Sequence, residues 1–106
     1  MQRIALFPGT FDPITIGHLD IISRSLSLFD KVIIGIGRNA NKLPMFSEEQ
    51  RLSWTKEIYK DNPQVDAVLY DGLTINCCQQ VGARFIIRGI RYVNDFEYEK
   101  AIADMN

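Results

Sequence analysis

The sequence predicts an α/β protein, with one parallel sheet covered by helices on both faces. Apolar runs of strand length alternate with segments of helix length along the chain, a pattern typical of parallel strands joined by right-handed crossovers. The 106 residues suffice for one compact core and are too few for two ordinary domains, and 46% of them are hydrophobic. We therefore expect a single Rossmann-like domain over residues 1–106, with four strands.

The first strand is expected over residues 3–7, directly before Pro8. The next helix is expected from about residue 17 to residue 29, because apolar side chains recur there at spacings of three, four and three residues and so share one helix face. These side chains are Leu19, Ile22, Leu26 and Phe29. The second strand is the apolar run over residues 31–36.

The second helix is expected to begin after Ser47. The Ser47 hydroxyl can cap free N–H groups of the first turn, while Gln50 reaches back as the other half of a capping box. Asn62-Pro63 ends this helix, because proline has no N–H group to donate within it.

The rest of the chain repeats the alternation. Residues 65–70 form the third predicted strand, and residues 73–81 form a helix that stops at Gly82 in the left-handed conformation. Residues 84–87 are the fourth strand, and a last helix is expected from residue 94 or 95 onward. That helix reaches the final residue without a glycine, a proline or a polar tail, so we expect a C-terminally shortened domain of a larger protein.

Charge and composition exclude several classes. The net charge of −1 lacks the broad basic field of duplex nucleic-acid binders, and no segment approaches the roughly 18 apolar residues of a membrane span. Residues 1–7 stop at Pro8 before the apolar core of a signal peptide could develop, so a cytoplasmic location is expected. Cys77 and Cys78 are adjacent, a spacing unlike zinc or redox sites, and are expected to be buried thiols in a helix.

Ligands of open parallel sheets bind beyond the carboxyl ends of the strands, where strand order reverses. An order of 3-2-1-4 would place the loops after the first and fourth strands at this point. His18 is then at a helix N-terminus, where backbone N–H groups and the helix dipole favour anions. Gly9 would permit close approach of a ligand to the backbone, and Thr10 and Thr15 would add hydroxyl donors. The alternative is that His18 only caps the helix and packs against its neighbours.

Cations follow two of the other strands. Arg38 and Lys42 follow the second strand, where the alternative for Lys42 is an ordinary solvated lysine. Arg88 and Arg91 follow the fourth strand, close enough together for both guanidinium groups to reach one polyphosphate. Glu99 and Asp95 share one helix face. This face is either part of the functional site or a solvated surface that pairs with arginines. The pattern indicates a phosphate-binding site.

Three stretches carry a family resemblance: Thr15-Ile16-Gly17-His18, which fits an (H/T)-x-G-H signature, the NKLPMF that contains Lys42, and IRGIRYVNDFEYE. On these motifs the whole chain resembles the nucleotidylyltransferases that carry this signature, and among them the bacterial phosphopantetheine adenylyltransferases. The arginine-rich motif distinguishes that family from its cytidylyl-transferring and nicotinamide-nucleotide-transferring relatives.

The resemblance implies a nucleotidyltransferase fold and a reaction of ATP with 4'-phosphopantetheine that gives dephospho-coenzyme A and pyrophosphate, with Mg²⁺. It implies His18 as the stabiliser of the transition state at the α-phosphate, with Lys42 and Arg91 as the other catalytic residues. The implied substrate-binding residues are Thr10, Lys42, Thr74 and Arg88. The implied ATP-binding residues are Thr10, Phe11, His18, Gly89, Ile90, Arg91 and Glu99. No protein ligand for a metal is expected, and the family is a hexamer that also binds coenzyme A.

Family members continue into another strand and a serine-rich ISSS-type segment that contacts ATP, which does not occur before Asn106. We therefore expect this chain, taken alone, to bind the pantetheine substrate better than it turns it over. Three alternatives stay open: an adenylyltransferase acting on nicotinamide mononucleotide, a non-catalytic nucleotide-binding or pantetheine-binding module, and a fragment of a class I aminoacyl-tRNA synthetase. The two-arginine motif argues against the first, and the missing length and basic surface argue against the last.

Overall fold

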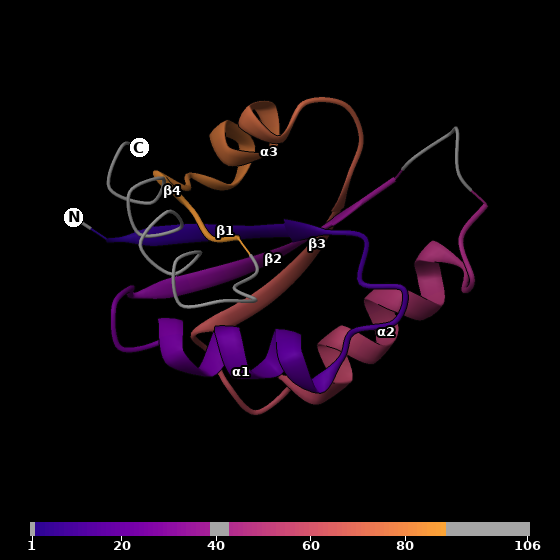
Figure 1. Cartoon of the computed structure of the whole chain (residues 1–106). Helices are drawn as coiled ribbons and strands as arrows, with labels where there is room; N and C mark the ends of the chain where they lie inside the picture. Colours follow the sequence, from indigo (N-terminus) through magenta and orange to yellow (C-terminus); the bar gives the residue numbers. More distant parts are fainter. Residues whose placement is uncertain (1, 39–42, 89–106) are drawn as a thin grey trace.

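The computed structural model describes residues 2–38 and 43–88, which form one parallel sheet with three helices (Figure 1). The sheet order is β3-β2-β1-β4, and all three strand pairs are parallel, as the sequence predicts. The strands are β1 (Ile4–Gly9), β2 (Lys31–Gly37), β3 (Val65–Tyr70) and β4 (Phe85–Ile86). The helices are α1 (Ile16–Ser25), α2 (Glu48–Ile58) and α3 (Thr74–Val81).

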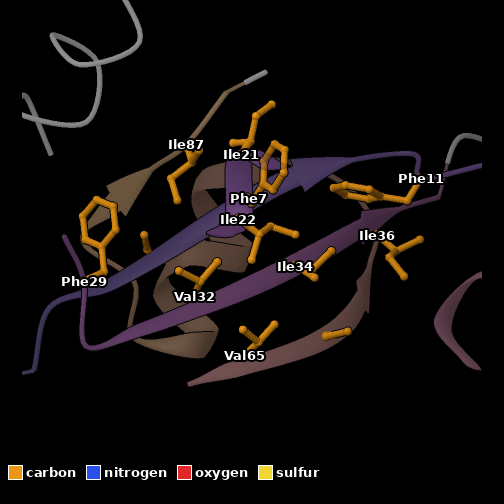
Figure 2. Packing of buried hydrophobic residues seen from close by; sticks show 12 residues of the cluster. Phe7, Phe11, Ile21, Ile22, Phe29, Val32, Ile34, Ile36, Val65 and Ile87 are labelled. Carbon is orange, nitrogen blue, oxygen red and sulfur yellow. The ribbon is translucent and has the colours of Figure 1, made fainter. Parts of the chain in front are cut away.

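Side chains of alternate strand residues point to opposite faces of the sheet and build two cores. Helices α1 and α2 cover one face, and α3 covers the other (Figure 1). The first core contains Phe7 of β1, Ile34 of β2 and Ile22 of α1, all at most 2% exposed (Figure 2). The second contains Leu6 of β1 and Ile33 of β2, which pack with the helix α3.

The second core is thin, and glycine makes room in it. A Cβ atom on Gly35 of β2 would lie 2.9 Å from Leu6 Cδ1 and 3.2 Å from Tyr70 Cε1. The Tyr70 ring therefore occupies the space that a side chain at position 35 would need. Cys77 and Cys78 of α3 are buried free thiols, as predicted, and burial is the main cause that raises the pKa of each.

Helix α1 is shorter than the sequence pattern suggested. It ends at Ser25, whose carbonyl accepts hydrogen bonds from the N–H groups of Leu28 and Phe29 at 2.9 and 3.2 Å. Phe29 still reaches the core, but from the turn after the helix. The spacing of apolar residues continued past the helix end because the turn also points Phe29 inward.

The predicted boundaries of α2 and α3 agree in part with the structure. The N–H of Gln50 donates to Ser47 Oγ at 3.1 Å, as predicted. The Gln50 side chain does not complete the capping box, because within the described residues its Oε1 atom lies 3.5 Å from the Ser47 hydroxyl and does not accept the Ser47 N–H. Helix α2 ends at Ile58, four residues before Asn62. Helix α3 ends at Gly82 with φ of 76°, as predicted. The helix expected from residue 94 lies outside the described residues.

Strand β4 is shorter than the predicted 84–87, although the N–H of Ile87 still donates to the Leu6 carbonyl at 2.8 Å. Within the described residues, no helix is both long enough and apolar enough to cross a membrane.

Candidate active site

The candidate site lies at the carboxyl edge of the sheet, where strand order reverses between β1 and its two neighbours. Thr10 directly follows β1 and is exposed, and Arg88 follows the adjacent β4 and is exposed. Thr74 begins α3 after β3, with its hydroxyl 3.1 Å from the Tyr70 hydroxyl. Thr10 and Arg88 therefore follow adjacent strands at one edge of the sheet, and Thr74 follows β3 at the same edge, separated from β1 by β2.

The structure shows the capping role of His18, because one ring nitrogen caps α1 and the other nitrogen takes no part in the cap. Thr15 is the N-cap residue, and its Oγ1 accepts a hydrogen bond from the His18 N–H at 3.4 Å. In return, the Thr15 N–H donates to His18 Nδ1 at 2.9 Å. Thr15 is thus part of a capping box, in which its hydroxyl oxygen accepts the His18 N–H.

The cap determines which tautomer of His18 is present. A backbone N–H can only donate, so Nδ1 must carry a lone pair, and the proton of the neutral imidazole is on Nε2. Partial burial lowers the pKa of His18, which also favours the neutral ring. The half-buried side chain therefore presents one oriented N–H donor from Nε2.

Two phenylalanines hold the imidazole from the side. The centroid of the Phe11 ring lies 4.7 Å from that of His18, and the Phe7 ring lies 6.1 Å away, both edge-on. Phe11 has a φ of 48°, a left-handed conformation that costs free energy for a residue with a Cβ atom. Burial of its ring, which is 2% exposed, compensates for that strain.

Gly9 makes room for the Phe11 ring. A Cβ atom at position 9 would lie 3.0 Å from Phe11 Cε2, because Phe11 turns back with a positive φ toward the core (Figure 2). The approach of a ligand to the backbone of Gly9 stays a prediction.

Arg38 does not offer a free cation. Its Nε lies 2.7 Å from Glu48 Oε2, and its Nη1 lies 3.2 Å from Asp71 Oδ2. The neighbouring Asp71 and then Glu48 carboxylates raise the pKa of the guanidinium. Arg38 therefore links the start of α2 to the loop after β3.

The sequence analysis did not identify a polar cluster next to Thr10 that contains Asp12 and Arg51. The Asp12 carboxylate accepts hydrogen bonds from the N–H groups of Met45 and Phe46 at 2.6 and 2.8 Å. Arg51 of α2 donates to the carbonyls of Thr10 and Phe46 at 2.8 and 3.2 Å. The sequence holds one signal for this cluster: Arg51 lies one helix turn before Thr55, so the two residues share one helix face.

Several predicted site residues lie outside the described residues. These are Lys42, Gly89, Ile90, Arg91 and Glu99. Among those described, Thr10, Phe11 and His18 come together in the loop and first turn that follow β1. Their assignment to ATP or to a second substrate stays a prediction.

A divalent metal would find few protein ligands in this part of the site. Over residues 2–38 and 43–88, no group of three or more histidine, cysteine or acidic side chains is arranged to hold a metal ion. Both carboxylate oxygens of Asp12 accept backbone N–H groups instead. The described residues therefore do not form a metal-binding cage.

Comparison with known proteins agrees with this fold. Residues 6–105 match the cytidylyltransferase-like family. A lipopolysaccharide core biosynthesis protein from Thermoplasma volcanium has a TM-score of 0.65 at 19% identity, over 99% of this chain and 89% of that one, a likeness of fold alone. A bifunctional NMN adenylyltransferase/ADP ribose pyrophosphatase from Francisella tularensis, solved with AMP and a Mn ion, has a TM-score of 0.62 at 25% identity, over 83% of this chain and 32% of that one. The fold and the site thus define a cytidylyltransferase-like protein.

Much higher similarity is found with one group of enzymes. The phosphopantetheine adenylyltransferase of Flavobacterium psychrophilum is 57% identical over 105 residues, which are 99% of this chain and 70% of that protein. The corresponding enzyme of Bacteroides thetaiotaomicron is 55% identical over the same shares. The chain therefore belongs to the phosphopantetheine adenylyltransferase family, and it spans about 70% of the length of these relatives.

Proposed function

We propose that this chain transfers the adenylyl group of ATP to 4'-phosphopantetheine, giving dephospho-coenzyme A and pyrophosphate. The observation that carries the proposal is the 57% identity over nearly the whole chain to an enzyme of that name. The site agrees with it, because an oriented neutral donor stands at a helix N-terminus on the ligand-binding edge of the sheet.

The reaction needs no protein nucleophile. A phosphate oxygen of 4'-phosphopantetheine attacks the α-phosphorus of ATP in line, one P–O bond forms, and the bond to the pyrophosphate leaving group breaks. Negative charge then grows on the oxygens around the α-phosphorus. Catalysis therefore consists of positioning the two substrates and stabilising that charge.

The His18 Nε2–H is the donor that we assign to the α-phosphate in the transition state. Its direction is set by the bond from the Thr15 N–H to Nδ1, so little reorganisation is required when charge develops. We assign Thr10 and Arg88 to the phosphate of the second substrate, since both follow neighbouring strands on this edge. Lys42 would join them, and Thr74 would line the pantetheine arm.

The nucleotide site in this proposal comprises Thr10, Phe11 and His18 with Gly89, Ile90, Arg91 and Glu99. Mg²⁺ would bind the ATP phosphates and neutralise part of their charge, as it commonly does without a full set of protein ligands. Coenzyme A as a further ligand and a hexameric assembly stay predictions from the family resemblance. A cytoplasmic location and a single domain over residues 1–106 stay predictions from the sequence.

The test supplies ATP and Mg²⁺ with one of two acceptors, 4'-phosphopantetheine or nicotinamide mononucleotide, and measures the adenylylated product by mass spectrometry. We expect dephospho-coenzyme A and no dinucleotide from the second acceptor. Absence of dephospho-coenzyme A from a chain that binds both substrates would leave the non-catalytic binding module as the correct reading.

A further inference from the structure

Arg51 is an unusual residue for the interior of a small protein. Its side chain ends in a positively charged guanidinium group, yet only 5% of the residue is exposed. Buried arginines normally have a carboxylate partner, because removing an unpaired charge from water is costly. The position therefore calls for a compensating negative charge.

The structure supplies hydrogen bonds to this guanidinium, but none of them comes from an acid. Its partners are the carbonyl oxygens of Thr10 and Phe46, at 2.8 and 3.2 Å. The ion pairs of residues 2–38 and 43–88 involve other arginines and a lysine, and none includes Arg51. Carbonyl dipoles satisfy the N–H donors and leave the net positive charge in place.

The Arg51 guanidinium and the Asp12 carboxylate, which are not joined by an ion pair, border the same cavity. A pocket of about 260 Å³ is lined by Thr10, Asp12, Gly37, Arg51 and the loop over residues 43–45. It opens at the carboxyl ends of β1 and β2, which is the ligand-binding edge of this sheet. An anion held at Thr10 would therefore be close to a buried positive charge.

The same side chain also fixes the walls of the pocket. One guanidinium holds Thr10 on the loop after β1 and Phe46 on the loop before α2. Asp12 completes the connection by accepting the N–H groups of Met45 and Phe46. The two loops, one of which leads directly to Lys42 in the sequence, are thereby held against each other.

We infer that Arg51 is a positioning residue for the phosphate group of the second substrate. It sets the separation of the loops that carry Thr10 and residues 43–46, and it supplies a positive charge that no direct ion pair within residues 2–38 and 43–88 neutralises. The inference rests on the proposed function for the identity of the phosphate compound.

The test compares Arg51→Gln with the parent chain and with Lys56→Gln. Lys56 lies on the same helix at an exposed position, so its replacement removes the same charge without touching the pocket. The ligands are 4'-phosphopantetheine and pantetheine, which differ only in the phosphate, titrated calorimetrically at low and high salt. Arg51→Lys is the conservative variant, because it keeps the charge and loses the fork that holds two carbonyls.

We expect Arg51→Gln to raise the Kd of 4'-phosphopantetheine about tenfold at low salt and by less at high salt, because the lost attraction is electrostatic. Lys56→Gln should match the parent chain. The Kd of pantetheine should change less than twofold in all variants. Arg51→Lys should recover the salt-dependent part of the lost affinity, and not the part that depends on holding two carbonyls.

Unchanged affinity of Arg51→Gln for 4'-phosphopantetheine would overturn the inference, and so would an equal loss for pantetheine, which would indicate a purely structural role. If Arg51→Gln shows no cooperative melt, Arg51→Lys decides the matter, and a Kd ratio between the two ligands equal to one would overturn the inference. A parent chain that fails to bind 4'-phosphopantetheine refutes the proposed function instead, and the inference falls with it.

Discussion

Replacing His18 by alanine is the most informative perturbation of the proposed mechanism. The substitution removes the Nε2–H donor and also the Nδ1 acceptor that caps the Thr15 N–H. The first loss should affect turnover and the second should affect stability. The two effects can be separated, because they involve different atoms of one ring.

The magnitude follows from the geometry. One preorganised donor removed from a developing oxyanion costs roughly 3–4 kcal/mol in the barrier, which is about a hundredfold to a thousandfold in turnover. Loss of half a capping box at an α1 terminus should cost about 1 kcal/mol of unfolding free energy. Binding of both substrates should change little, because the donor acts mainly in the transition state.

The assay is single-turnover formation of dephospho-coenzyme A at saturating ATP and 4'-phosphopantetheine, with melting curves in parallel. His18→Gln is the matched control, since glutamine at this helix position can still accept from the Thr15 N–H. We expect it to melt like the parent chain while turning over more slowly. Parental turnover by His18→Ala, or a loss confined to substrate affinity, would remove His18 from the chemistry.

Three further predictions concern titratable groups. Because burial lowers the pKa of His18, the unfolded chain binds more protons than the folded chain near pH 6. The contribution of His18 to stability is therefore present above the ordinary histidine pKa and is lost as pH falls through the lowered pKa. Urea melts of the parent chain and of His18→Gln would detect this loss as a pH-dependent slope in the parent only. Turnover should fall over the same acidic range, since protonation of Nδ1 breaks the Thr15 bond, and a pH–rate profile that rises toward acid would contradict the assigned tautomer. Burial raises the pKa of Cys77 and Cys78, so both thiols should react with iodoacetamide at pH 8 at least tenfold more slowly in the folded chain than in urea, and equal rates would contradict their burial.

The fold was predictable because each element has a local signal. Strand-length apolar runs alternate with capped segments, which predicts a parallel sheet, and the order 3-2-1-4 suggested by the doubly wound pattern is the one observed. The end of α1 was wrong by four residues, since the spacing that places Phe29 toward the core is satisfied equally well by a turn. Helix α3 was right because Gly82 adopts a conformation that other residues disfavour.

The site was predictable only in outline. The (H/T)-x-G-H signature located His18, but it could not reveal that Nδ1 is occupied by the Thr15 N–H. The contact of Gly9 with the Phe11 ring was not predicted, because no local pattern indicates that Phe11 turns back with a positive φ. Arg51 escaped notice because its partners, the carbonyls of Thr10 and Phe46, belong to segments that meet only in three dimensions.

The measurement that tests the central claim most directly is calorimetric titration of the folded chain with 4'-phosphopantetheine, with nicotinamide mononucleotide as the control ligand. Selective binding of the pantetheine compound, weakened at high salt, is the predicted result. Equal affinity for the two ligands, or tighter binding of the mononucleotide, by a chain that melts cooperatively would contradict it.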